Sequence, residues 1–199
     1  MLNQLAPLPV LAVALQACST QPELLNSERI EKTFGSYGIE ILESNDAVRR
    51  SNLYSLEDGD RVCRTYAVVQ FLEHDTGYTD QVHEEVVSGG SIGATFKSYG
   101  WQIFKQTLHV GSITIPDSGT NVAQLMQLAP PRRLAMHVYR LLLEKDGQSV
   151  EYARIIEVHH PEYLDEAALR ELFDVSESTF LSQDQVSALV SLVTDLQNN

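Results

Sequence analysis

The sequence predicts an α+β domain with a mostly antiparallel sheet and flanking helices, and two observations lead to this fold class. Two apolar runs, 134–143 and 149–158, are joined across Asp146-Gly147, a dipeptide that tolerates the positive φ angles of a tight hairpin turn. Helical patterns are gathered between and after the strand patterns instead of alternating with each strand in turn. Hairpin pairing and grouped helices are typical of α+β proteins, whereas regular alternation is typical of α/β proteins.

The periodicity of apolar residues predicts the elements one after another. A short amphipathic helix is expected over 24–34, and the first strand begins at Ile39. A loop with Arg49, Arg50 and Asn52 is expected next. The later elements are a central strand over 61–72, helices over 80–87 and 92–99, a strand over 101–115, a helix over 120–128, the hairpin, a helix over 165–173, and a last helix that Ser182 caps in a Ser-x-x-Gln box.

Length and composition limit the classes of function. The chain of 199 residues fits one ordinary domain, and its 43% of apolar residues suffice for a core without metal or disulfide staples. Its net charge of −13 repels phosphate backbones, so we expect no nucleic-acid partner.

The first residues are typical of an exported protein. The uncharged stretch 5–15 is too short to cross a bilayer as a helix and is interrupted by two prolines. Leu15-Gln16-Ala17-Cys18 resembles the lipobox of bacterial lipoproteins, in which the cysteine is acylated and becomes the new N-terminus. The resemblance implies a signal peptide over 1–17, a tether over 18–23, and one α+β domain over 24–199.

The same resemblance implies a location in the bacterial cell envelope. Because Ser19 stands where inner-membrane lipoproteins often have Asp, we expect the outer membrane, with the domain facing the periplasm. No Lys or Arg precedes the apolar stretch, which departs from the usual signal peptide. The alternative is a cytoplasmic protein with an apolar N-terminal arm.

Only two cysteines are present. If Cys18 carries a lipid, Cys63 has no partner in an oxidising compartment, and we expect it to be buried in a strand as a small hydrophobic residue. A disulfide between the two cysteines is the alternative.

The hairpin contains the most informative polar residue. If Asp146 and Gly147 form a two-residue turn, Tyr139 lies opposite Arg154, on the apolar face that packs on the core. A guanidinium does not lose its charge, so a buried Arg154 needs a carboxylate, a hydrogen-bond network or an anionic ligand. His137, Tyr152 and the adjacent Tyr139 share its predicted face. The alternative is a structural arginine that extends to the rim of the sheet.

Two further features point to an anion. Arg64 lies in the predicted central strand, where the same argument applies. Ser88-Gly89-Gly90-Ser91-Ile92-Gly93 precedes a helix, and its N–H groups and Ser91 suit an oxyanion, although such clusters also form simple turns. His159-His160 lacks the spacing of a metal site, so no metal and no cofactor are expected.

A family resemblance covers part of the chain. Phe96-Lys97-Ser98-Tyr99-Gly100, the helix ending at 128, and the hairpin from Asp146 to Arg154 resemble the UTRA ligand-binding domains, which have a chorismate lyase-like fold. The resemblance implies that Arg154 and Ser91 contact an anionic effector such as a sugar phosphate. In chorismate lyases a catalytic Glu stands in place of Arg154, so its absence argues against the lyase reaction.

The sequence therefore predicts a membrane-anchored periplasmic domain that binds a small anion, a sugar phosphate or a carboxylate; enzyme activity stays open, and no catalytic residue is expected. The expected ligand-binding residues are Arg64, Ser91, His137, Tyr139, Tyr152 and Arg154. The alternative function is an envelope lipoprotein that binds another protein and no small molecule. A lyase related to chorismate lyase is a third possibility, and no general base near the arginines supports it.

Overall fold

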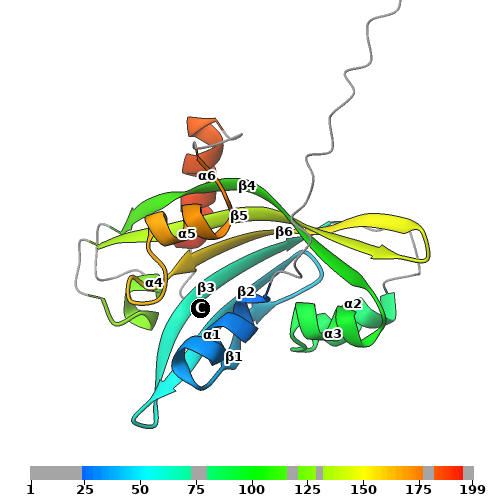
Figure 1. Ribbon diagram of the computed structural model, residues 1–199, viewed down its shortest axis with the longest axis horizontal. Coiled ribbons are helices and arrows are strands. Elements are labelled where there is room, and N and C mark those ends of the chain that lie inside the picture. Colours follow the sequence, from blue (N-terminus) through cyan, green and yellow to red (C-terminus); the bar gives the residue numbers. More distant parts are fainter. Residues whose placement is uncertain (1–23, 73–79, 116–120, 129–131, 177–181, 195–199) are drawn as a thin grey trace, which may run out of the picture.

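A six-stranded antiparallel sheet forms the centre of the computed structural model, with the strand order β1-β2-β3-β6-β5-β4 (Figure 1). The structure describes residues 24–72, 80–115, 121–128, 132–176 and 182–194. The α+β class and its antiparallel sheet are confirmed. The strands are β1 (Gly38–Ser44), β2 (Val48–Glu57), β3 (Asp60–Phe71), β4 (Gln102–Ile115), β5 (Arg132–Lys145) and β6 (Gln148–His159).

The predicted signal peptide over 1–17, the tether over 18–23 and Cys18 lie outside the described residues. Of the helices that the structure describes, none has the length and apolar character needed to span a bilayer.

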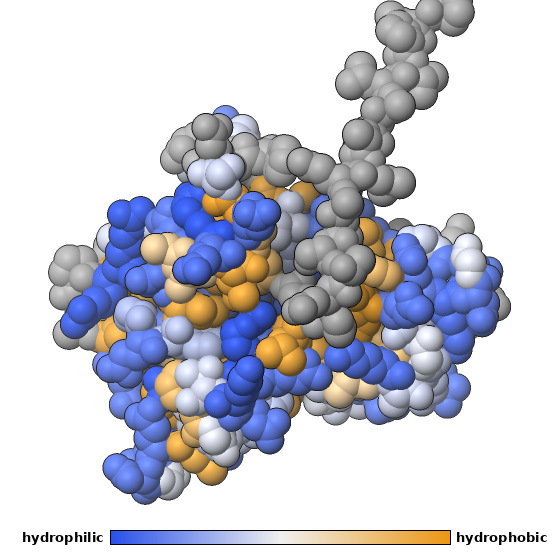
Figure 2. Space-filling model, viewed as in Figure 1, coloured by the Kyte–Doolittle hydropathy of each residue, from blue (hydrophilic) through white to orange (hydrophobic). Residues whose placement is uncertain are grey.

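Helices cover both faces of the sheet. On one face, called the α1 face, Ile30, Val86, Phe96 and Leu169 pack on inward side chains of the strands. On the opposite face, called the α6 face, α4 and α6 cover the central strands. The helices of the α1 face are α1 (Asn26–Phe34), α2 (Asp80–Val87), α3 (Ile92–Ser98) and α5 (Glu166–Leu172); those of the α6 face are α4 (Asn121–Leu125) and α6 (Gln183–Thr194). Figure 2 shows the side with α1, α3 and α5, where hydrophobic residues gather between hydrophilic ones.

The central strand β3 is buried on both faces, as its β-branched and aromatic sequence predicts. Cys63 is 1% exposed and free, which confirms its predicted burial. Burial raises the pKa of the Cys63 thiol to about 12, so the thiol stays protonated at neutral pH.

The hairpin turn is formed as predicted, but the register of the two strands differs from the predicted one. Asp146 and Gly147 have φ angles of 53° and 78°, and Lys145 faces Gln148. Further from the turn, Leu142 faces Glu151 and Leu141 faces Ala153, which leaves Tyr152 as the extra residue of a β-bulge.

This bulge reverses the orientation of the next residues of β6. Tyr139 faces Ile155, and Arg140 faces Arg154, so the predicted pairing of Tyr139 with Arg154 is wrong. A register shift of one residue exchanges the two faces of a strand. Arg154 therefore lies on the α6 face, and Glu157 lies on the α1 face.

The segment expected to be a loop is strand β2, and this expectation is wrong. β2 pairs with β1 on one side and with β3 on the other, so its backbone is satisfied although several of its side chains are polar. Arg49 faces Val69 across the sheet and so lies on the α1 face. At the other end of the chain, the predicted cap is confirmed: the backbone N–H of Gln185 donates to Ser182 Oγ, and that of Ser182 donates to Gln185 Oε1.

Candidate functional site

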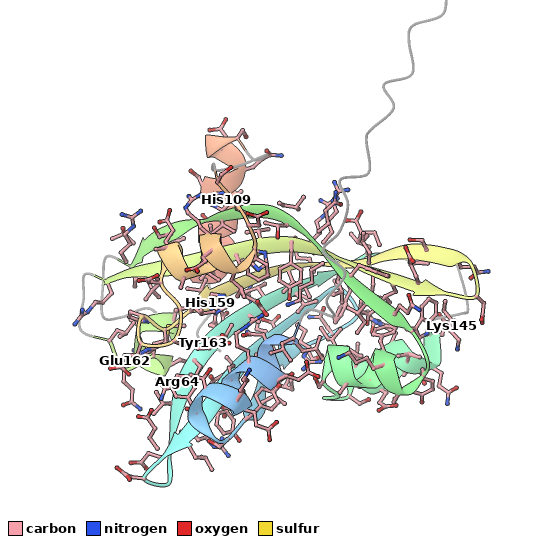
Figure 3. All side chains as sticks on the ribbon, in the orientation of Figure 1. Arg64, His109, Lys145, His159, Glu162 and Tyr163 are labelled. Carbon is pink, nitrogen blue, oxygen red and sulfur yellow. The ribbon has the colours of Figure 1, made fainter. Side chains whose placement is uncertain are left out.

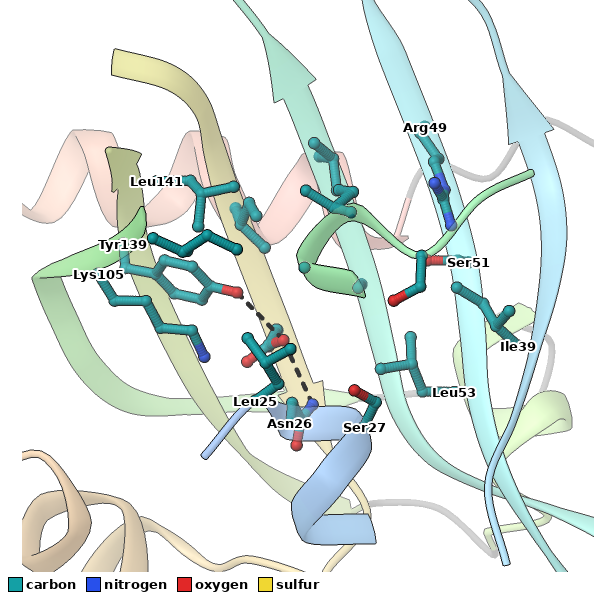
Figure 4. A pocket seen from close by; sticks show the side chains of 18 of the residues that line it. Leu25, Asn26, Ser27, Ile39, Arg49, Ser51, Leu53, Lys105, Tyr139 and Leu141 are labelled. Carbon is teal, nitrogen blue, oxygen red and sulfur yellow. Dashed lines mark hydrogen bonds between the residues drawn. The ribbon is translucent and has the colours of Figure 1, made fainter. Parts of the chain in front are cut away.

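A cavity lies on the α1 face, between the sheet, the start of α1 and the start of α3 (Figure 4). Its volume is about 90 Å³, several times the roughly 10–15 Å³ that one ordered water needs. We call it the α1–α3 cavity. Its walls are mainly apolar, from residues such as Leu25, Leu53, Val69 and Ile155; its polar residues include Arg49, Ser51, Ser91, Lys105, Tyr139 and Glu157.

Arg49 is the buried cation of this cavity, with an exposed fraction of 1%. Its Nη1 donates to the carbonyl oxygens of Val86 at 3.0 Å and Gly90 at 2.6 Å. Its Nε has no partner among the described residues, and no described carboxylate forms an ion pair with it. Burial lowers the pKa of Arg49, while the neighbouring phenols of Tyr37 and Tyr152 raise it. Since a guanidinium stays charged in proteins, the two carbonyl dipoles compensate a full buried charge.

Glu157 lies on the same face, two strands away, and is 5% exposed. Its Oε1 accepts from Asn26 Nδ2 and from Tyr139 Oη, both at 3.3 Å. No described lysine or arginine forms an ion pair with it. Lys105 lines the same cavity, with its Nζ 4.8 Å from the centre of the Tyr139 ring. Figure 4 shows Arg49 and Lys105 on opposite sides of the cavity.

A buried network of hydrogen bonds joins the start of α1 to the sheet beside the cavity. Asn26 Nδ2 donates to Thr65 Oγ1 at 3.1 Å, and Tyr163 Oη donates to Asn26 Oδ1 at 2.7 Å. Thr65 Oγ1 lies 2.9 Å from His159 Nδ1. Burial lowers the pKa of His159 to about 4, against an opposing effect of Glu157, so the imidazole is neutral at pH 7.

Two of the predicted site residues, Ser91 and Tyr139, line the cavity. Ser91 occupies the N-cap position of α3, but its side chain makes no capping hydrogen bond. Burial raises the pKa of Tyr37, and a hydrogen bond with Ser91 opposes this effect. The Ser91 hydroxyl therefore faces the cavity wall formed by Tyr37.

Two others, His137 and Tyr152, are fully buried and are not among the lining residues. His137 stacks on Phe173 with ring centroids 3.9 Å apart, and its Nε2 lies 3.0 Å from Thr107 Oγ1. Burial lowers the pKa of His137 well below its usual value. Tyr152 Oη lies 2.7 Å from His83 Nδ1, and burial raises its pKa. Both side chains support the core next to the cavity.

Arg64 is buried with an exposed fraction of 0% for its side chain, but it lies away from the cavity, near Glu162 (Figure 3). It donates to Ser55 Oγ at 2.8 Å, forms ion pairs with Glu57 and Glu162, and stacks on the Phe34 ring at 3.8 Å. Two exposed glutamates of the same chain thus neutralise Arg64, and its predicted place beside the other site residues is wrong.

The prediction that Arg154 points into the core is also wrong. Its side chain is 51% exposed on the α6 face, and its Nε lies 3.3 Å from Glu151 Oε1. The physical reason is the Tyr152 bulge, which periodicity alone does not reveal.

The sequence interpretation missed Arg49, Lys105 and Glu157. A signal for Arg49 was present: Asp58-Gly59 repeats the dipeptide of the other hairpin, with φ angles of 52° and 94°, and joins β2 to β3. That turn predicts a strand before it and therefore a strand position for Arg49. For Glu157 no comparable signal exists, because its face depends on the bulge.

Comparisons with known proteins give a distant structural likeness. No protein-family model matches the chain, and no curated protein sequence matches it. A solved structure, the C-terminal domain of the histidine utilization repressor from Pseudomonas syringae, matches with a TM-score of 0.39 and 9% identity, over 65% of this chain and 94% of that one. A likeness of this size establishes neither a family nor a ligand for this chain.

Proposed function

We propose that the domain binds a small anionic molecule, with a carboxylate or phosphate group, in the α1–α3 cavity. The observation that carries this proposal is the buried guanidinium of Arg49, which has no carboxylate partner among the described residues. A buried charge is costly unless it is paired, and two backbone carbonyls supply only partial charges. An anionic group of a ligand supplies the missing countercharge.

The charges along the cavity support an anion. Arg49 and Lys105 are positive and Glu157 is negative, which leaves an excess of one positive charge. The whole chain has a net charge of −13, so this local excess opposes the charge of the rest of the molecule. Apolar walls with a few convergent polar groups are the usual lining of a small-molecule site.

The decisive measurement is ligand-dependent stability of the full-length protein against a panel of small carboxylates and phosphates. A ligand that binds only the native state at one hundred times its dissociation constant stabilises it by about 2.7 kcal/mol. We expect this effect to be lost in Arg49→Gln and kept in Arg154→Gln, which makes the same change on the opposite face.

A second variant keeps the test informative if Arg49→Gln does not fold. Lys105→Gln alters a partly exposed residue of the edge strand β4, so the fold should persist. We expect it to weaken binding of every acid, by roughly two- to fivefold for a solvent-accessible charge pair. If no acid stabilises the wild-type protein, the small-anion proposal is wrong and the protein-binding alternative gains support.

We further propose that the domain is tethered to the outer membrane through a lipid on Cys18 and faces the periplasm. The lipobox-like Leu15-Gln16-Ala17-Cys18 supports this location. Membrane fractionation tests it, since Cys18→Ser should release the protein into the soluble fraction. An unprocessed full-length mass without added acyl chains would refute the lipid anchor.

A further inference from the structure

Glu157 forms a second, poorly satisfied polar end of the α1–α3 cavity. A carboxylate can accept about four hydrogen bonds, whereas Glu157 accepts two from the residues that the structure describes, Asn26 and Tyr139. Both are 3.3 Å long, beyond the ordinary range for such bonds. Asn26 Nδ2 also donates to Thr65 Oγ1, at 3.1 Å. The hydrogen bond from Asn26 to Glu157 is therefore the longer of the two that this amide group makes.

The groups around Glu157 do not neutralise it. His137 faces Glu157 from the neighbouring strand β5, and His159 follows Glu157 two residues later on the same face of β6. Burial holds the pKa of both imidazoles below the usual value, so both are neutral at pH 7. Arg29 of α1 donates to the carbonyl oxygen of Leu24 instead. The Lys105 ammonium lies over the Tyr139 ring and forms no ion pair with Glu157.

Glu157 and Arg49 stand at separate ends of the cavity. Arg49 faces Val69, which faces Ile155, while Ser51 faces Ala67, which faces Glu157. The two residues are therefore two strands and two positions apart, which places their Cα atoms about 12 Å from each other. Because both side chains line one cavity, a single small molecule can contact both.

We propose that the ligand has two different ends: an anionic group near Arg49, and a hydrogen-bond-donating group, ammonium or hydroxyl, that Glu157 accepts. This inference rests on the proposed function, and it narrows the ligand to hydroxy acids, amino acids and similar molecules. A simple anion without a donor leaves the Glu157 carboxylate unsatisfied and costs the affinity of a hydrogen bond to a charged group.

The test compares three series of carboxylates with matched chain lengths, which differ only in the terminal group: n-alkanoates, ω-hydroxyalkanoates and ω-aminoalkanoates. Calorimetric titration of the full-length protein measures the affinity for each. We expect the hydroxy or the amino series to bind about tenfold or more tightly than the alkanoates, the gain of one hydrogen bond to a buried charge. Whichever of the two series binds more tightly identifies the donor.

Glu157→Gln should reduce the affinity ratio between donor-bearing acids and alkanoates, and most for the amino series, because the amide oxygen still accepts a hydrogen bond but lacks the charge. Glu151→Gln is the matched control, because it makes the same change on β6 on the opposite face. Equal affinity of all three series for the wild-type protein refutes the two-ended ligand but leaves anion binding intact. An equal effect of Glu157→Gln on all series also refutes it, because Glu157 then does not distinguish ligands by their donor group. Failure of every acid to bind counts against the proposed function itself.

Discussion

Thr65 and His159 form a fully buried hydrogen bond, with Thr65 Oγ1 2.9 Å from His159 Nδ1. The bond joins β3 to β6, because the two residues face each other across the strands. Asn26 of α1 also donates a hydrogen bond to Thr65 Oγ1. The protonation of His159 therefore affects the packing of α1 as well as the sheet.

Stability should fall as the pH falls from about 6.5 to about 4. Burial lowers the pKa of His159 to about 4 in the folded protein, below its ordinary value of 6.5, so the unfolded state binds more protons in this interval. Its contribution is present above pH 6.5, is lost as the pH falls toward 4, and is on the order of 3 kcal/mol. Urea unfolding at pH 7 and pH 4 measures it. His159→Gln should reduce this pH dependence, and an unchanged slope would show that other groups cause it.

The two predicted site arginines should differ in their effect on stability. Arg64→Ala removes a buried side chain that stacks on Phe34, and we expect a cost of about 2–3 kcal/mol. Arg154→Ala removes an exposed partner of Glu151 and should stay within about 0.5 kcal/mol. Denaturant midpoints of both variants test the contrast. Comparable costs for the two would contradict the orientation of β6.

Loss of Asn26 should release α1 in preference to the sheet. Asn26→Ala leaves Tyr163 Oη without its acceptor and removes a donor from both Thr65 and Glu157. Unsatisfied buried groups cost about 1–3 kcal/mol each. Native-state hydrogen exchange should become faster in 26–34 than in β3 or β6. Glu31→Ala, an exposed change in the same helix, is the control. Uniform acceleration across the sheet would contradict a local role.

Cys63 should be unreactive until the protein unfolds. Its thiol is 1% exposed and its pKa is raised to about 12, so little thiolate forms at neutral pH. In Cys18→Ser, where it is the remaining cysteine, a thiol reagent should label it in denaturant and not in buffer. Absence of a free thiol in the unfolded, unreduced wild-type protein would instead support the disulfide alternative.

The parts of the fold that follow from local sequence were predictable. Asp146-Gly147 predicts its turn, and Asp58-Gly59 carries the same information for the hairpin that was missed. The bulge at Tyr152 was not predictable in this way. Tyr152 packs on Phe96 with ring centroids 4.6 Å apart and on Phe71 at 5.6 Å, and both residues are distant in sequence. Such tertiary packing decides which residue of a strand is left unpaired.

The candidate site depended on the same long-range contacts. The argument that a buried arginine without an acid attracts an anion applies to Arg49 and not to Arg154 or Arg64. Its acceptors, the carbonyls of Val86 and Gly90, lie at the end of α2 and in the turn before α3. Sequence periodicity identifies a residue type on a face, but only the assembled helices determine whether an acid is nearby.

The location of Arg49 inside a strongly acidic molecule has a kinetic consequence. A small acid that approaches the cavity first meets the repulsion of a protein with a net charge of −13, and only then the guanidinium. Added salt screens the long-range repulsion over about 8 Å at physiological ionic strength, while the buried contact is screened much less. Association with a small anion should therefore become faster as salt is added, the reverse of the usual behaviour of anion-binding proteins with basic surfaces.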